Sequence, residues 1–191
     1  MNKLRLLLVF FTVMFFSSPL TAQLTAWSAG LAFSSGIDYN TRTTGNPAIF
    51  GKAYIKINDR FHLVPSLAAF NKFKYSNFSE VLKTYMFHAD ADAVYSLYKD
   101  KSLRFLGFAG INATAIYSKW DILERTPSSR YLYNMSDVKP GLNLGGAFQL
   151  YVNDSFDAYI SGKYVIGPFS QMVINVGGIY YVGGKRRRGM W

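Results

Sequence analysis

The chain has 191 residues, a formal net charge of +10 at pH 7, 17% aromatic residues, 17% charged residues and no cysteine. The lack of cysteine excludes disulfides, cysteine-ligated metals and lipid attachment through an N-terminal cysteine. This aromatic content, together with 16 glycines, is a poor match to an ordinary soluble sandwich and suits a barrel with aromatic girdles.

The N-terminal 22 residues have the pattern of a secretory signal peptide. Lys3 and Arg5 precede an apolar stretch over residues 6–16, and a small-residue segment ends at Ala22, the predicted cleavage site. An uncleaved membrane anchor is the alternative, but the apolar stretch is shorter than the ~20 residues that a spanning helix requires. The sequence therefore predicts residues 1–22 as signal peptide, residues 23–184 as one exported domain and residues 185–191 as a basic periplasmic tail.

Apolar residues take every second position in eight stretches of the exported domain. Segments of about ten residues with this period are the strands of a transmembrane β-barrel, in which one face meets lipid. The predicted strands cover residues 24–39, 48–57, 61–75, 85–97, 103–117, 142–152, 156–166 and 172–182. Because only closed barrels and helices satisfy every backbone amide inside a membrane, we predict an all-β fold, an eight-stranded antiparallel up-and-down barrel in the outer membrane.

Proline 65 is the awkward residue of the third predicted strand. Proline cannot donate a hydrogen bond to a neighbouring strand, and a closed barrel has no free edge on which to place it. We therefore predict a bulge or a local register change near Pro65.

The fourth predicted strand shows which face is the lumen. Its aromatic and alanine residues alternate with His88, Asp90 and Asp92. A charge facing hydrocarbon near the midplane costs about 2 to 4 kcal/mol, so the charged face must look inward. The outward faces then form two aromatic girdles, one of Trp27, Phe61, Phe105, Phe156 and Tyr180 and one of Tyr39, Tyr75, Tyr85, Tyr117 and Tyr164.

Connections between the predicted strands alternate in length. Tight polar turns are expected at residues 58–59, 99–101 and 153–154, and longer loops at 40–47, 76–83 and 120–138. The last outer connection, at residues 167–169, is short. With both termini on the short-turn side, the short turns are expected to be periplasmic and the long loops external.

Charged and polar residues of the lumen predict a buried network of Lys52, Ser66, His88, Asp90 and Asp92. Counting from the predicted turns places Lys52 level with Ser66, and Ser66 level with Asp92, while Asp90 and His88 lie further out. Because unpaired charges inside a closed barrel are costly, we expect Lys52 to reach across Ser66 toward Asp92.

A metal site or a catalytic site at His88, Asp90 and Asp92 is not favoured. Alternate strand positions lie about 6.6 Å apart, too far for all three side chains to meet one small ion. The carboxylates lie near the barrel middle, beyond the reach of lipid or peptide, and no serine occupies a recognisable nucleophile motif. No catalytic, cofactor or metal site is predicted, and the protein is not expected to be an enzyme.

The loop predicted at residues 120–138 and the basic tail are the candidate contact surfaces. Exposed aromatic groups among arginines are typical of interface cores, although the loop is equally suited to a lid over the barrel mouth. The tail suits a solvated stop that touches anionic lipid headgroups, or docking to an acidic periplasmic partner. Nucleic-acid binding has no support beyond charge. The candidate contact residues are Trp120, Arg125, Arg130, Tyr131, Tyr133, Lys185, Arg186, Arg187 and Arg188.

These features together resemble the small eight-stranded outer-membrane proteins of the OmpX and OmpW type in the Gram-negative cell envelope, including the transmembrane part of OmpA. The resemblance covers residues 24–184 and rests on the signal peptide, the eight segments, the alternation of short and long connections and the aromatic belts. Members usually end the last strand on an aromatic residue that the assembly machinery reads. Here residues 185–189 separate Trp191 from that strand, so insertion is expected to use a different signal.

Two classes of function remain open at this point. The first is a structural or interaction protein, such as an accessory subunit of a larger outer-membrane assembly. The second is a narrow channel or transporter for ions or small hydrophobic molecules. A plugged lumen is favoured by the bulky inward residues Phe50, Tyr54, Phe70, Leu106, Phe108, Tyr151, Tyr159 and Tyr181. The alternative is a gap at the small residues Gly145, Ser161 and Gly177.

Overall fold

The computed structural model describes residues 23–36, 46–76, 80–100, 102–123 and 130–182. The predicted signal peptide, Tyr39, Arg125 and the tail of residues 185–191 lie outside these ranges. In the described residues no helix is long and apolar enough to cross a membrane. The strands are β1 (Gln23–Ser34), β2 (Asn46–Lys56), β3 (Phe61–Phe70), β4 (Phe73–Ser76), β5 (Glu80–Lys99), β6 (Leu103–Leu123), β7 (Arg130–Asn153), β8 (Phe156–Ile166) and β9 (Gln171–Tyr181).

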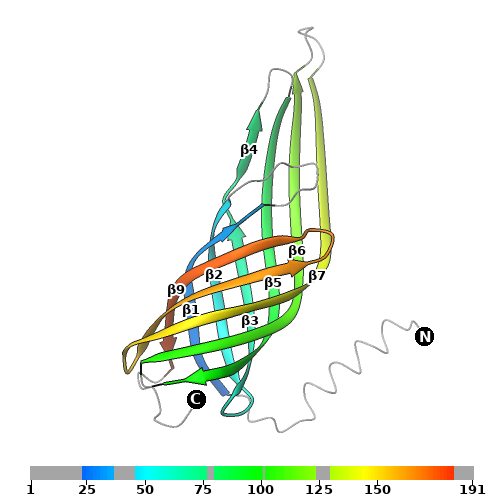
Figure 1. Ribbon diagram of the computed structural model, residues 1–191. Coiled ribbons are helices and arrows are strands. Elements are labelled where there is room, and N and C mark those ends of the chain that lie inside the picture. Colours follow the sequence, from blue (N-terminus) through cyan, green and yellow to red (C-terminus); the bar gives the residue numbers. More distant parts are fainter. Residues whose placement is uncertain (1–22, 37–45, 77–79, 101, 124–129, 183–191) are drawn as a thin grey trace, which may run out of the picture.

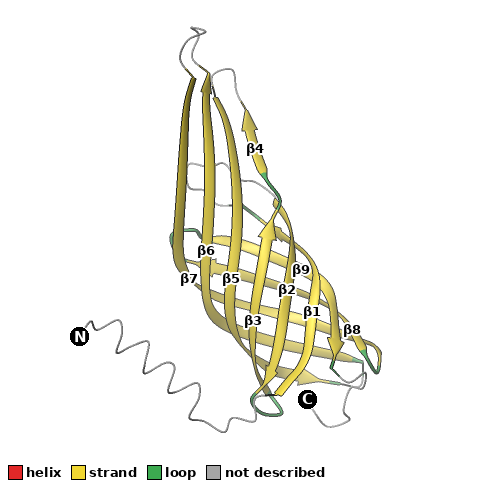
Figure 2. Cartoon of the chain, turned by 180° about the vertical axis from the view of Figure 1, so that it is seen from behind, coloured by secondary structure: helices red, strands yellow, loops and turns green. Residues whose placement is uncertain are grey.

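The strands close into one antiparallel barrel (Figure 1). Their order is β3-β2-β1-β9-β8-β7-β6-β5-β4, and β3 also pairs with β5, which closes the sheet. Because β3 and β4 pair in succession with β5, they are two parts of one barrel strand, as Figure 2 shows. The predicted eight-stranded barrel is therefore confirmed.

Side-chain burial alternates along every barrel strand, as the dyad pattern predicts. The outward positions are exposed and apolar: Leu31 is 57% exposed, Ile49 67%, Leu67 68% and Ile111 63%. The inward positions are buried and include polar residues such as Ser28, Asn112 and Gln149. A band of exposed aliphatic side chains around a closed polar interior is the signature of a barrel in a lipid bilayer.

Aromatic side chains gather near both ends of the outward face. Trp27 and Tyr180 lie with ring centroids 5.5 Å apart, and Phe105 and Phe148 lie 4.9 Å apart, on the side of the short turns. Tyr85 and Tyr117, with centroids 6.2 Å apart, belong to the opposite belt. Tyr75 lies on β4 opposite Leu82, and its place in the outward belt stays a prediction.

The bulge predicted near Pro65 is absent. Register runs without a shift from Phe61↔Tyr95 to Ala69↔Phe87 across Pro65, and only the β2–β3 pairing lapses between Lys52↔Ser66 and Ile55↔Leu63. Proline thus leaves a gap in one ladder rather than an extra residue.

The shift occurs further along the same strand, between β3 and β4. Ala69 pairs with Phe87, whereas Phe73 pairs with Thr84, so the pairing moves by one residue at residues 71–72. A one-residue shift exchanges the two faces of a strand, so the alternation predicted for residues 61–75 does not run unbroken through that stretch.

Short polar turns join the strands at one end of the barrel, as predicted. The Asn58 side chain accepts hydrogen bonds from the backbone amides of Arg60 and Phe61, each at 2.9 Å. Lys56 pairs with Asp59 at 2.7 Å, and this hydrogen bond and charge lower the pKa of the Asp59 carboxyl.

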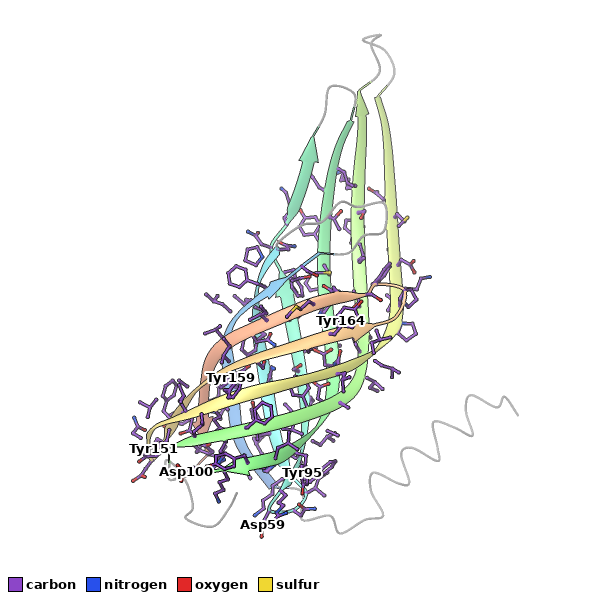
Figure 3. The ribbon with its side chains drawn as sticks, in the orientation of Figure 1. Asp59, Tyr95, Asp100, Tyr151, Tyr159 and Tyr164 are labelled. Atoms are coloured by element: carbon purple, nitrogen blue, oxygen red, sulfur yellow. The ribbon has the colours of Figure 1, made fainter. Side chains whose placement is uncertain are left out.

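Tyr151 does not face the lumen, contrary to the prediction. It is 40% exposed, lies at the short-turn rim and donates a hydrogen bond to Asp154 at 3.0 Å (Figure 3). A register shift between Tyr151 and Asn153 explains the difference, because a bulge re-aims the side chains beside it.

At the opposite end β4 and the ends of β5, β6 and β7 continue beyond the rest of the barrel (Figure 1). β8 reaches only Ile166, opposite Leu142, whereas β6 and β7 stay paired as far as Leu123↔Arg130. The loops predicted at residues 76–83 and 120–138 are therefore largely strand, and only residues 77–79 and 124–129 lie outside the described residues there. Pairing with a neighbour satisfies backbone amides outside the bilayer as well as inside it, so the hairpins do not end at the membrane surface.

Candidate functional site

The centre of the lumen is organised around the carboxylate of Asp90 on β5. Lys163 of β8 contacts Asp90 Oδ2 at 2.6 Å, and Ser66 of β3 donates to the same oxygen at 3.0 Å. The amides of Asn112 on β6 and Asn143 on β7 donate to Asp90 Oδ1 at 2.6 and 3.0 Å. Side chains from four other strands thus converge on one buried anion, because each occupies an inward position of its own strand.

Asp92 joins this cluster through a shared donor. The Asn143 amide donates to Asp92 Oδ1 at 2.8 Å as well as to Asp90. Thr114 extends the network by donating to Asn112 Oδ1 at 2.6 Å. Buried charges that are paired and hydrogen-bonded in this way are costly to disrupt one partner at a time.

Lys52 is not placed as predicted. It lies level with Ser66, but Ser66 pairs with Asp90 in the sheet, and Asp92 lies opposite Val64. The ammonium of Lys52 lies over the rings of Phe50 and Tyr159, 5.2 and 5.3 Å from their centroids, which are cation–π distances. The cation paired with the carboxylates is Lys163, which the sequence places on the polar face of its strand but does not assign to Asp90.

His88 belongs to a different cluster near the mouth of the barrel. Its Nε2 lies 3.1 Å from the side-chain nitrogen of Gln171, and its ring lies 4.6 Å from that of Phe70. Gln171 in turn accepts a hydrogen bond from Ser34 at 2.5 Å. His88 therefore links β5 to β9 and β1, and the structure separates it from the carboxylates with which the sequence grouped it.

A third polar cluster lies toward the short-turn end and was not predicted as a site. Gln149 donates to Asp157 at 2.5 Å and to the Tyr181 hydroxyl at 2.6 Å, and Tyr181 donates to Asp157 at 2.5 Å. Arg104, opposite Gln149 in the sheet, is buried at the same level. The inward positions of Gln149 and Asp157 are visible in the sequence, whereas their contact requires the register.

Bulky side chains fill the space between these polar layers. Gly177 and Gly145, where a gap was the alternative, lie directly under the rings of Phe50 and Phe108, which a β-carbon at either glycine would meet. A cavity between the Asp92 layer and Tyr159 has a volume of about 20 Å³. That is room for about one water molecule, so the lumen is packed rather than open at this level.

The chemistry available in the lumen is correspondingly limited. Within the described ranges, no three histidine, aspartate or glutamate side chains lie close enough to hold a metal ion. Asp90 and Asp92 are both less than 10% exposed, so no substrate reaches them. The cluster is suited to holding five strands together.

Outside the lumen, the predicted contact residues fall mainly on the projecting strands. Trp120 lies opposite Tyr133, Tyr131 opposite Ile122, and Arg130 opposite Leu123. The strands that carry them, β6 and β7, extend the barrel wall and do not fold over its mouth (Figure 1). Arg125, Lys185, Arg186, Arg187 and Arg188 lie outside the described residues.

The projecting sheet has an unpaired edge along β7. In the described residues, β7 pairs with β6 from Arg130 to Leu150, but its pairing with β8 begins only at Leu142. Among the described strands, residues 130–141 therefore have a pairing partner on one side alone. The side chains of Asn134, Ser136, Val138 and Pro140 are exposed along this edge. A free strand edge presents unpaired N–H and C=O groups to another chain.

Comparison with solved structures identifies similar barrels. The attachment invasion locus protein Ail of Yersinia pestis has a TM-score of 0.56 and 13% identity, over 84% of this chain and 99% of that one. The outer membrane protein OprG of Pseudomonas aeruginosa has a TM-score of 0.55 and 14% identity, over 84% and 97% of the two chains. The N-terminal barrel domain of OprF from the same organism has a TM-score of 0.52 and 14% identity, over 85% and 100%.

No protein-family model matches the chain, and no curated protein matches it either. At these identities the likeness concerns the fold. The chain thus has the fold of the small eight-stranded outer-membrane barrels, as the sequence pattern predicted.

Proposed function

We propose that this protein is a non-catalytic interaction protein of the outer membrane, which binds a protein partner through the β7 edge of its projecting sheet. The observation that carries the proposal is the unpaired edge of β7 over residues 130–141, on a barrel whose lumen is packed at the level of Asp92 and Tyr159. An accessory subunit of a larger outer-membrane assembly is the role that fits both features.

Strand addition is the binding mode that this edge supports. An extended segment of a partner gains main-chain hydrogen bonds when it pairs with an exposed strand, and alternate side chains supply specificity. Pro140 indicates which amides are free. Pro140 has no N–H, yet it lies opposite Ala113 in an unbroken β6–β7 ladder. Residue 140 is therefore a position at which the backbone N–H would point away from β6. Because amide direction alternates along a strand, the amides of Asn134, Ser136 and Val138 face the free side.

The lumen supports a structural role better than transport. The Asp90 cluster ties β3, β5, β6, β7 and β8 together, and the Phe50 and Phe108 rings fill the space above the lumenal glycines. A narrow channel would need these side chains to move apart, at the cost of separating buried charges. The rigid wall instead gives the projecting strands a fixed base.

Two further contacts are proposed, one with lipid around the barrel and one made by the basic tail. The exposed aliphatic band is in keeping with outer-membrane lipid around the barrel. We further propose that Lys185 to Arg188 contact lipid headgroups or an acidic periplasmic partner. No contact with nucleic acid is proposed.

Extraction of the tagged protein from native outer membranes in mild detergent tests this function. Sizing and mass spectrometry should show a stoichiometric larger membrane protein travelling with the barrel. Asn134→Pro/Ser136→Pro should abolish the association, because it removes two free-side donors without touching the β6 ladder. Asn134→Ala/Ser136→Ala is the matched control and should retain it.

A second deletion variant separates the two candidate surfaces. If removal of residues 185–191 alone releases the partner, the tail and not the sheet edge is the docking element. A lone monomer from native membranes, together with discrete conductance steps in planar bilayers, would overturn the proposal and favour the channel.

A further inference from the structure

Lysines lie opposite one another on the outward face where the projecting sheet leaves the barrel. Lys74 of β4 pairs with Lys83 of β5, and Lys83 pairs with Lys119 of β6. Like charges directly opposite each other destabilise a sheet. No acidic side chain of the described residues pairs with Lys83 or Lys119. A row of this kind therefore favours the binding of an anionic group.

Below the lysines the same two strands carry the outer aromatic belt. Tyr85 and Tyr117 lie directly opposite each other, two positions further toward the barrel from Lys83 and Lys119. Tyrosines on the outward face mark the interface between headgroups and acyl chains. The lysines are thus at the level of the phosphates of the adjacent leaflet.

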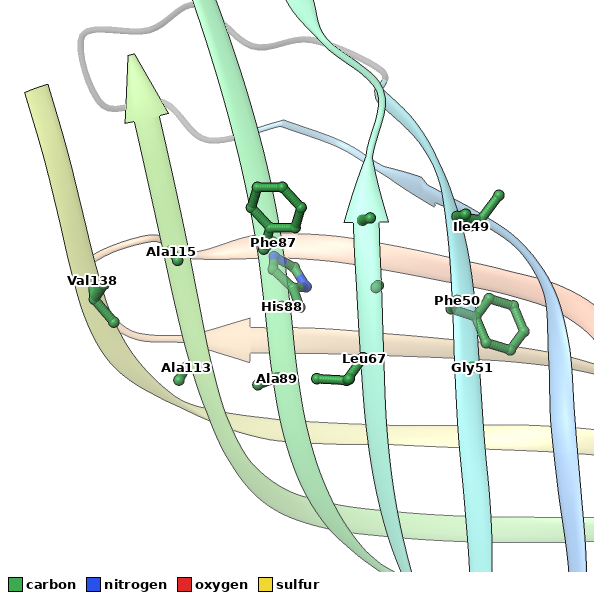
Figure 4. A pocket seen from close by; sticks show the side chains of 12 residues that line it. Ile49, Phe50, Gly51, Leu67, Phe87, His88, Ala89, Ala113, Ala115 and Val138 are labelled. Carbon is green, nitrogen blue, oxygen red and sulfur yellow. The ribbon is translucent and has the colours of Figure 1, made fainter. Parts of the chain in front are cut away.

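Beneath the tyrosines the wall is hollowed into an apolar groove of about 580 Å³ (Figure 4). Its floor contains Ala89, Ala113 and Ala115, and larger side chains, Leu67, Phe87 and Val138, stand around it. The register explains the shape, since Ala89 lies opposite Ala113 and is flanked by Leu67, while Ala115 lies between Phe87 and Val138. The volume is within the range of sites for small ligands.

We propose that these features form one binding site for a phosphate-bearing lipid of the outer leaflet. The phosphate lies between the ammonium groups of Lys83 and Lys119, and an acyl chain runs past Tyr85 and Tyr117 into the groove. Six residues separate Lys83 from Ala89, about 20 Å of strand, so headgroup and chain contact the protein at separate levels. Charge complementarity selects an anionic lipid over a second copy of this chain, whose lysines would face these lysines.

Native mass spectrometry of the full-length barrel tests the site. The probe is dipalmitoyl phosphatidic acid, compared with phosphatidylcholine of the same chains and with inorganic phosphate as competitor. We expect retention of one phosphatidic acid, weaker retention of phosphatidylcholine, and no displacement by inorganic phosphate. Lys83→Gln and Lys119→Gln should each weaken binding about fivefold. The double variant should weaken binding more than tenfold.

Matched variants separate the site from general effects on the barrel. Ala89→Leu, which fills the groove, should weaken binding about tenfold through lost chain contact. Lys99→Gln at the short-turn end and Ala109→Leu, which faces outward on β6 away from the groove, should leave binding unchanged. Heat-modifiable migration in gels verifies that every variant is a folded barrel.

Three outcomes would overturn the proposal. Equal retention of both lipids would show that no phosphate is recognised. Full displacement by inorganic phosphate would show an anion site without the groove. A dimer of the barrel that disappears with Ala89→Leu would show that the groove is an interface between two copies.

Discussion

The barrel body and the projecting sheet are made of the same strands but satisfy their backbones differently. In the body every strand has two neighbours, so β5, β6 and β7 are paired on both sides as far as the rim. Beyond the rim β7 keeps only β6 and retains a free edge. Closure provides stability in the membrane, whereas the unclosed part provides the surface at which another molecule can pair.

The strongest expected effect concerns the buried ion pair of the body. Lys163→Met leaves the Asp90 carboxylate without its cation and should lower the free energy of unfolding by about 3 to 5 kcal/mol. Urea unfolding of the barrel folded in lipid vesicles measures this change. Asp90→Asn/Lys163→Met removes both charges and should recover most of the loss. A double variant as unstable as the single one would show that the pair is not what holds these strands.

Placing a charge on the lipid-facing side of the body should have the next largest effect. Ala91 faces outward opposite Ile111, and Ala91→Arg should cost about 2 to 4 kcal/mol and impair insertion, because a charge then meets hydrocarbon. Insertion into vesicles, followed by gel migration, gives the folded fraction. Ala91→Val, which enlarges the side chain without adding a charge, is the control. Normal insertion of Ala91→Arg would contradict the assignment of the faces.

A pair of glycine variants tests how closely the body is packed. A β-carbon at Gly30 would meet the Val176 carbonyl and the Phe50 ring, whereas nothing lies within 4 Å of one at Gly162. Gly30→Ala should therefore destabilise the barrel by about 1 to 3 kcal/mol, and Gly162→Ala should be close to neutral. Comparing the two urea midpoints measures the difference. Equal midpoints would mean that the lumen has more free space than the structure shows.

The smallest effect on the whole molecule is expected in the projecting sheet. Asp137→Pro removes an amide that faces β6 and should cost about 1 kcal/mol locally. Site-resolved hydrogen exchange should show faster exchange around residues 130–137 and an unchanged barrel body. Asp137→Ala removes only the 3.1 Å ion pair with Lys139 and keeps the ladder. Loss of the entire barrel on Asp137→Pro would show that the two regions unfold together.

Much of the body follows from the alternation of residues along each strand. The stretch predicted at residues 156–166 is β8 itself, and the inward positions of Asn143, Gln149 and Lys163 are as expected. Alternation assigns each residue to a face because a strand has only two faces. It says nothing of which residues on different strands lie level.

The prediction of the candidate site was wrong where it depended on register. Ser66 lies level with Asp90 and not with Asp92. The hairpin pairs Ser76 with Val81, one residue from the predicted count, and the pairing shifts by one further residue at residues 71–72. The sequence pattern predicts loops in place of the projecting strands because residues beyond the membrane no longer need an apolar outward face. Their strand pairing there leaves little trace in the hydrophobic pattern.

Hydrogen exchange at alternate amides of β7 tests the central claim most directly. The amides of Asn134, Ser136 and Val138 should be protected in native outer membranes, where a partner strand pairs with them, and should exchange rapidly in the purified barrel. The amides of Met135 and Asp137, which face β6, should be protected in both. Rapid exchange of Asn134, Ser136 and Val138 in native membranes as well would contradict the account, because the edge would then have no strand partner.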